Sequence, residues 1–167
     1  MAQAPTPAAG SDVADLAQRS ADAPAAGSGP DKNCGCPKRK VNGIELRYLK
    51  FRSLSHVGHS WYKMGNESVG WWPSPDSWAI GSFVNTNGSV NNGRPRDPHH
   101  NDTPDVTYDL YTKDGDCRTD EEIQQCIKNY YYQKGARGDR YSVMSYDVCH
   151  SVADAASKHC GLTQKER

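Results

Sequence analysis

Alternation of side chains marks four candidate strands. Apolar or aromatic side chains recur at every second position in three segments: Ile44 to Tyr48, Val57 to Trp61 and Val106 to Leu110. Successive side chains of a strand point to opposite faces of a sheet, so this spacing predicts strands with one buried face. A fourth segment, Glu67 to Trp72, follows the second across the turn sequence Gly65-Asn66. We expect these two neighbours to pair as an antiparallel hairpin.

Helical spacing appears further along the chain. Thr119-Asp-Glu-Glu122 has the form of a capping box, in which the hydroxyl and the carboxylate each bind an amide left unpaired at a helix start. The helix that it opens is expected to stop at Gly135. Its apolar residues are three or four positions apart: Ile123, Ile127, Tyr130 and Tyr131. A last helix is predicted from near Asp147 to Gly161. Its buried stripe is Cys149, Val152, Ala156 and Cys160. These elements predict an α+β domain, with an antiparallel sheet packed against helices.

Two segments show neither the alternation of a strand nor the spacing of a helix. Residues 1–33 consist mainly of Ala, Pro, Gly, Ser and Asp, and burial of so few apolar groups could not offset the backbone entropy lost on folding. We therefore divide the chain into a disordered arm or linker, residues 1–40, and one domain, residues 41–167. Residues 85–105 are rich in Asn, Gly, Pro and Asp, and we predict a long surface loop there.

Composition narrows the range of partners. The 20 Lys and Arg residues balance 20 Asp and Glu residues, so no summed charge attracts nucleic acid or anionic lipid. No apolar run approaches the roughly 20 residues needed for stable insertion across a bilayer. Met1 to Gly10 lacks the positive start and apolar stretch of a secretory signal. If the protein leaves its cell, we expect another machine to carry it.

The cysteine content favours an oxidising destination. The six cysteines are Cys34, Cys36, Cys117, Cys126, Cys149 and Cys160. Cys34 and Cys36 flank one glycine, and no second closely spaced pair follows to complete a four-ligand zinc site. A thiol pair in a loop or a partial disulfide is the simpler interpretation of this pair.

Cys149 and His59 are the candidate catalytic residues. Cys149 falls in the first turn of the last predicted helix, where unpaired amides and the helix dipole favour the thiolate, the nucleophilic form. The alternative is a small apolar core residue. His59 lies on a predicted strand, in Gly58-His59-Ser60-Trp61. A base on a strand that faces a cysteine on a helix is the arrangement of papain-type catalysis, and the Cys149 backbone amide would serve as oxyanion hole.

The chain resembles the circularly permuted papain-like hydrolases, a group that includes permuted NlpC-type peptidases and lecithin:retinol acyltransferase-like enzymes. Four segments carry the resemblance: Gly58-His-Ser-Trp61, Ser68-Val-Gly-Trp-Trp-Pro73, Tyr146-Asp-Val-Cys149 and Cys160-Gly-Leu162. In that group the histidine strand precedes the cysteine helix, which is the order here. The cysteine motif departs from the pattern, because Val148 precedes Cys149 and His150-Ser-Val follows it, where relatives have Asn-Cys with Thr-Asp-Phe or Glu-His-Phe. This departure bears on the substrate, since those residues help to line the cleft.

The resemblance implies a cysteine hydrolase that needs no cofactor and no metal. His59 would take the thiol proton, Cys149 would form a thioester, and His59 would then activate water. A third polar residue normally orients the base. The candidates are Asp97, His99, His100, Asp102, Glu67 and Ser68.

Domains of this kind also occur as toxic effectors of bacterial secretion systems, including type VI systems. The Ala/Pro-rich arm and the missing signal suit such cargo, which would act in the target-cell periplasm and have a secretion-machine carrier and an immunity protein as partners. We expect an amidase or peptidase acting on cell-wall peptidoglycan, ahead of a lipid acyl hydrolase or acyltransferase. Membrane binding would need an apolar face or a cationic surface, and the sequence offers neither.

Two other functions compete with this interpretation. A zinc hydrolase would use residues of metal-binding type: His56, His59, His99, His100 and Asp102. His56 and His59 are an odd number of positions apart, so on a regular strand they point to opposite faces unless Gly58 forms a bulge. A non-catalytic cell-wall-binding module would use a tryptophan face: Trp61, Trp71, Trp72 and Trp78. Tryptophans at this density more often fill the core of a small domain.

Overall fold

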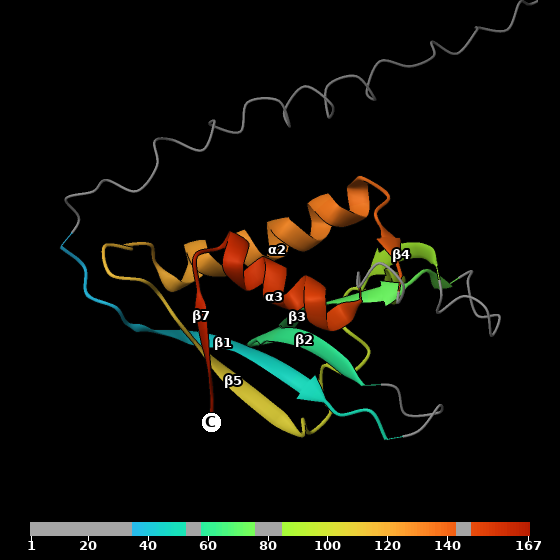
Figure 1. The fold of residues 1–167 in the computed structure, drawn as a ribbon, viewed down its shortest axis with the longest axis horizontal. Helices are drawn as coiled ribbons and strands as arrows, with labels where there is room; N and C mark the ends of the chain where they lie inside the picture. The colour runs from blue at the N-terminus through green and yellow to red at the C-terminus, as the bar shows by residue number, and fades with distance from the viewer. Residues whose placement is uncertain (1–34, 53–57, 76–84, 143–147) are drawn as a thin grey trace, which may run out of the picture. The chain divides into compact units, whose positions relative to one another are not determined.

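The computed structural model describes residues 35–52, 58–75, 85–142 and 148–167 (Figure 1). Residues 1–33 of the predicted arm, which spans residues 1–40, lie outside the described residues. So do six residues named above: Cys34, His56, Val57, Trp78, Tyr146 and Asp147.

In the described part of the chain, seven strands form one antiparallel sheet. Their order across the sheet is β6-β4-β3-β2-β1-β5-β7. The strands are β1 Lys40–Leu49, β2 His59–Met64, β3 Glu67–Pro73, β4 Thr86–Val90, β5 Val106–Tyr111, β6 Arg140–Tyr141 and β7 Thr163–Glu166. The predicted hairpin of β2 and β3 is confirmed, with Gly65 at positive φ in its turn.

Two helices, α2 Asp120–Ala136 and α3 Cys149–His159, lie on one face of this sheet (Figure 1). The predicted capping box is confirmed: the Thr119 hydroxyl accepts from the Glu122 N–H, and the Glu122 carboxylate accepts from the Thr119 N–H. Helix α3 is followed by Gly161 at a φ of 68°, in the left-handed region that favours glycine. The predicted α+β class, with an antiparallel sheet and helices packed on it, is therefore confirmed.

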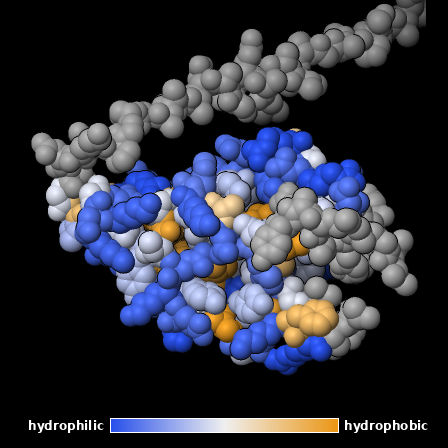
Figure 2. Space-filling view, in the orientation of Figure 1, coloured by the Kyte–Doolittle hydropathy of each residue, from blue (hydrophilic) through white to orange (hydrophobic). Residues whose placement is uncertain are grey.

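The hydrophobic core lies between the helices and one face of the sheet. Leu46, Tyr62 and Val69 are neighbours in register on this face, and all three are buried. The Tyr62 hydroxyl donates to the Ala153 carbonyl of α3 at 2.7 Å, which ties the helix to the middle of the sheet. Hydrophilic residues cover most of the described surface in Figure 2.

The opposite face of the sheet carries the alternate residues of the same strands. Arg47, Trp61 and Gly70 form one row across it. His59 shares this face with Trp61, and the two rings lie parallel with centroids 5.8 Å apart. The chain after β4 reaches this face, because a Cβ on Gly70 would lie 2.0 Å from Asp97 Oδ2.

The prediction of one long loop over residues 85–105 was wrong in its first part. Thr86–Val90 forms β4, which pairs with β3 and β6, and a short 3-10 turn follows at Asn91–Gly93. Gly88 gives the physical reason, since a Cβ there would lie 1.9 Å from the Trp71 indole. This glycine permits close packing of a ring on a strand and does not make a turn.

The folded domain extends upstream of Val41, into residues that the sequence assigned to the arm. Cys36 forms a disulfide with Cys117. The Arg39 N–H donates to the Thr112 hydroxyl at 3.1 Å. The segment that leads into β1 is therefore attached to the domain by a covalent bond and by backbone hydrogen bonding.

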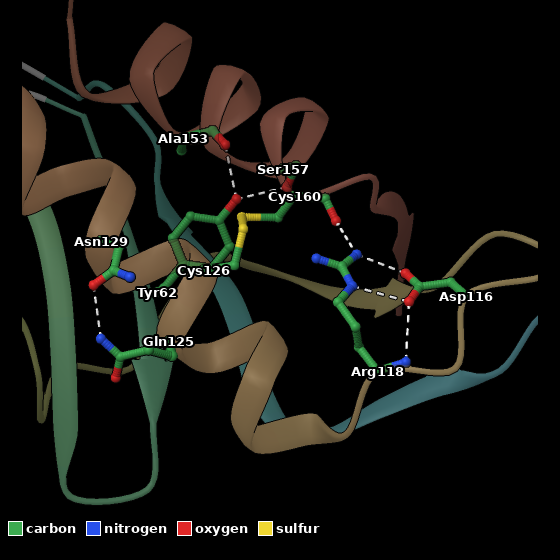
Figure 3. The surroundings of a disulfide bond; sticks show 9 residues. All are labelled: Tyr62, Asp116, Arg118, Gln125, Cys126, Asn129, Ala153, Ser157 and Cys160. Carbon is green, nitrogen blue, oxygen red and sulfur yellow. Dashed lines mark hydrogen bonds and ion pairs between the residues drawn. A yellow bond between two sulfur atoms is a disulfide. The ribbon is translucent and has the colours of Figure 1, made fainter. Parts of the chain in front are cut away.

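A second disulfide, Cys126–Cys160, joins α2 to the residue that follows α3 (Figure 3). Beside it, the Arg118 guanidinium donates to the Cys160 carbonyl oxygen at 2.6 Å and to the Asp116 carboxylate at 2.6 Å. These contacts fix the C-terminal end of the helix whose first residue is Cys149.

Replacing Cys126 and Cys160 together by alanine is expected to lower the free energy of unfolding by about 2–4 kcal/mol, because the crosslink restricts the unfolded chain. Urea denaturation of the oxidised wild type and the double variant measures the difference. The reduced wild type is the control, and it should lose at least as much stability as the variant. A denaturation midpoint unchanged by the double replacement would show that this bond does not stabilise the domain.

Candidate active site

Cys149 is the first residue of α3, and it lies against the start of β2. Its side chain is buried, and Sγ is 3.8 Å from the Gly58 carbonyl oxygen. Among the described cysteines it is the one outside a disulfide. The Ser151 hydroxyl accepts from the Val148 N–H at 3.0 Å, which closes the first turn of the helix. The thiol therefore faces the positive end of a helix dipole, as predicted.

Gly58 positions the chain that leads into β2. A Cβ at this residue would lie 2.8 Å from the Leu49 carbonyl oxygen and 2.9 Å from the Phe51 nitrogen. Only a glycine permits such a close approach to the end of β1. The next residue, His59, is thereby held at the end of the sheet where α3 begins.

His59 is paired with Asp97, a residue of the segment that follows β4. The His59 Nε2 atom is 2.8 Å from Asp97 Oδ2, and both side chains are almost completely buried. Three other groups hold the aspartate. The Trp72 indole N–H donates to Oδ2 at 2.8 Å, the His99 N–H donates to Oδ1 at 2.8 Å, and the Ser68 hydroxyl accepts from the Asp97 N–H at 2.9 Å. The aspartate is thus fixed before any substrate binds.

Gly70 provides the space for this pair. A Cβ on Gly70 would lie 2.0 Å from Asp97 Oδ2 and 2.9 Å from His59 Nε2. Any side chain at this position of β3 would displace the carboxylate or the ring. The Val-Gly-Trp-Trp segment therefore contributes both an indole donor, Trp72, and the space in which the carboxylate sits.

Electrostatics favours the charged forms of all three groups. Burial lowers the pKa of His59, but the charge and hydrogen bond of Asp97 outweigh burial and raise it to about 9. Burial raises the pKa of the Cys149 thiol, but hydrogen bonds to His150 and His59 outweigh burial and lower it to about 5. Burial also raises the pKa of Asp97, and the positive charge of His59 lowers it below its usual value. Because Nε2 binds Asp97, Nδ1 is the ring nitrogen left for the thiol.

Between these two pKa values, Cys149 is a thiolate and His59 is an imidazolium. We expect kcat/KM to fall as the pH drops through about 5, where the thiol takes up a proton, and as it rises through about 9, where His59 loses one. Alkylation of Cys149 by iodoacetamide should be fast at about pH 6 and at least about tenfold slower in His59→Ala. A wild-type alkylation profile with its midpoint near the ordinary thiol value of 9.0 would contradict this prediction.

Two further residues, Tyr141 and His150, affect the thiol, and neither was among the candidate catalytic residues. Burial raises the pKa of Tyr141, and the thiolate charge and a hydrogen bond to Cys149 raise it further. His150 is the next residue of α3, and its Nδ1 is hydrogen-bonded to the Ser60 hydroxyl of β2. Tyr141 stands in a two-residue strand, where no sequence period could have revealed it.

Of the six candidates for the third polar residue, the one that binds the His59 ring is Asp97. His99 Nδ1 pairs instead with Asp102 at 2.6 Å. Glu67 is exposed and pairs with Lys128 at 2.6 Å. His100 is buried. Its backbone N–H donates to the backbone carbonyl oxygen of Asp97 at 2.9 Å.

The described residues also bear on the two competing functions. The described residues contain no group of three or more His, Cys, Asp or Glu side chains placed to hold a metal ion. Trp61 and Trp71 are completely buried, so they cannot form part of a binding face. His56 and Trp78 lie outside the described residues.

Comparison with known protein families, curated proteins and solved structures finds no match for this chain. Within the described residues, no helix is both long enough and apolar enough to cross a membrane. The geometry of the site is therefore what bears on function.

Proposed function

We propose that this protein is a cysteine hydrolase in which Cys149 is the nucleophile, His59 the general base and Asp97 the residue that orients His59. The observation that carries the proposal is the buried pair of Asp97 and His59, 2.8 Å apart, beside the start of α3, where the Cys149 sulfur contacts the carbonyl oxygen of Gly58, the residue before His59. A nucleophile beside a base that a third group orients is the arrangement required for covalent catalysis.

The proposed reaction is acyl transfer to water. The Cys149 thiolate attacks the substrate carbonyl carbon, and a C–S bond forms. His59 gives its proton to the leaving amine as the C–N bond breaks, which leaves a thioester. The neutral His59 ring then takes a proton from water, the hydroxide attacks the thioester carbon, and the C–S bond breaks. A carboxylic acid leaves, and the thiolate and imidazolium are restored.

Two donors beside the thiol suit the oxyanion that forms in both steps. One is the backbone amide of Cys149, at the start of α3, and the other is the Tyr141 hydroxyl. Donors fixed in advance near the developing charge lower the barrier more than solvent would, because they need no reorganisation.

The fold is proposed to be the circularly permuted papain-like arrangement, and the substrate an amide of bacterial peptidoglycan. In support of the fold, the histidine strand β2 precedes the cysteine helix α3, and the helix start contacts the strand start. In support of an effector that acts in a periplasm, two disulfides join described residues, as suits an oxidising compartment. A carrier and an immunity protein are the partners that this role would require.

Product analysis tests the reaction class. The purified protein is incubated separately with peptidoglycan fragments and with phospholipid vesicles, and new amines and free fatty acids are measured. We expect new amines with the wild type and none with Cys149→Ala. Release of fatty acids that depends on Cys149, with peptidoglycan fragments intact, would overturn the substrate and keep the nucleophile. Neither product, in a protein whose Cys149 is unreactive at mildly acidic pH, would overturn the proposed hydrolase itself.

A further inference from the structure

His150 is held in a defined orientation beside the candidate nucleophile. Its Nδ1 atom is hydrogen-bonded to the Ser60 hydroxyl of β2, and its ring centroid is 4.4 Å from that of Tyr48 of β1. Two strands therefore fix this ring, although it follows Cys149 directly in the helix. The ring is half-buried, unlike the almost completely buried His59.

Adjacent residues of a helix do not normally face each other. Here both are directed at the start of β2, since the Cys149 sulfur contacts the Gly58 carbonyl oxygen and His150 contacts Ser60, two residues further along. With Nδ1 bound by the hydroxyl, Nε2 is the ring nitrogen left for the thiol. Hydrogen bonding to His150 is among the effects that lower the thiol pKa.

We propose that His150 is a second histidine that stabilises the Cys149 thiolate, independently of the His59–Asp97 pair. The inference rests on the proposed function, since it concerns the nucleophile of that same site. The two histidines differ in their partners: Asp97 is a carboxylate that holds His59, whereas Ser60 and Tyr48 hold His150 through a neutral hydroxyl and a ring contact. Removal of either histidine should therefore weaken the thiolate without eliminating it.

The two histidine rings, His59 and His150, have different roles in the proposed site. His59 has one nitrogen on Asp97, which leaves the other to exchange protons with the substrate in the steps proposed above. His150 has one nitrogen on a hydroxyl that itself can donate or accept, so its ring can donate to the sulfur in the resting enzyme. Stabilisation of the resting thiolate by His150 would act before substrate binds, and stabilisation by His59 would act throughout the reaction.

The test is the pH dependence of iodoacetamide alkylation at Cys149, followed by mass spectrometry in five proteins: the wild type, His59→Ala, His150→Gln, Ser60→Ala and His159→Gln. In His150→Gln we expect the midpoint to rise by about one pH unit, which makes alkylation below the midpoint about tenfold slower. Ser60→Ala should shift it in the same direction by less, because the ring remains but is no longer anchored. His159→Gln is the matched control, since His159 is exposed at the other end of α3, and it should leave the midpoint unchanged.

The outcomes separate this inference from the proposed function. A wild-type midpoint near that of an ordinary cysteine would overturn both. A low wild-type midpoint that rises in His59→Ala but stays unchanged in His150→Gln and in Ser60→Ala would overturn the role of His150 alone. If His150→Gln melts at a lower temperature than the wild type, the Ser60→Ala profile decides, because that change removes only one hydroxyl.

Discussion

Replacement of Cys149 by alanine is expected to reduce kcat/KM by at least about 10³-fold, the loss that follows removal of a covalent nucleophile. No other thiol in the described part of the chain could take its place. Four described cysteines are paired in two disulfides, Cys36 with Cys117 and Cys126 with Cys160. The side chain of Cys149 is small and buried, so alanine should fit the site without a change of backbone.

The matched control for this variant is Cys34→Ala. Cys34 lies outside the described residues, and the proposed mechanism gives it no role. Hydrolysis of peptidoglycan fragments is measured for both variants, with thermal melting as a check on folding. We expect full activity in Cys34→Ala. If Cys149→Ala kept its activity and a different cysteine replacement abolished it, the assignment of the nucleophile would be wrong.

The elements with a clear period could be predicted from the sequence. In β2, the alternation places Ser60 and Tyr62 toward the helices and Trp61 on the other face, as the register and the Tyr62 hydrogen bond show. The capping box at Thr119 predicted the first residue of α2 correctly, because both of its hydrogen bonds are local. Such interactions depend on neighbours in sequence, so sequence alone reveals them.

Elements without a period could not be predicted. β7 is an edge strand with largely exposed residues on both faces, so no alternation marks it. β6 has only two residues. The residues of β4 are typical of turns, so the sequence predicted a loop there. The strand is explained by the close contact of the Trp71 ring with Gly88. In each case the strand is set by its partner in the sheet and not by its own composition.

The same distinction applies to the site. Cys149 was found because a helix start is a local signal. Asp97 could not be separated from five other candidates, because it is 38 residues from His59 and no sequence pattern joins them. The signal that existed was Gly70, whose missing side chain leaves space for the carboxylate. That signal can be interpreted only when the partner across the space is known.

Replacement of Asp97 by asparagine is expected to reduce kcat/KM by about 10²- to 10⁴-fold, although the shape of the side chain is kept. Asparagine has no negative charge to hold the imidazolium form of His59. Its amide group could also donate to Nε2, which would favour the wrong tautomer of the ring. The Trp72 indole and the His99 N–H would compete for the single remaining amide oxygen.

The pH profile distinguishes loss of this orienting charge from a loss of structure. In Asp97→Asn, the alkaline limb of kcat/KM should move from about 9 towards the ordinary histidine value of 6.5, because the main effect that raises the pKa of His59 is gone. Asp102→Asn is the matched control: Asp102 is half-exposed and pairs with His99, so both the rate and the limb should stay at their wild-type values. Gly70→Ala gives an independent test, since its methyl group would push into the same carboxylate and lower the rate in the same direction. An Asp97→Asn enzyme with wild-type activity and an unmoved alkaline limb would remove Asp97 from the mechanism and leave the role of Cys149 intact.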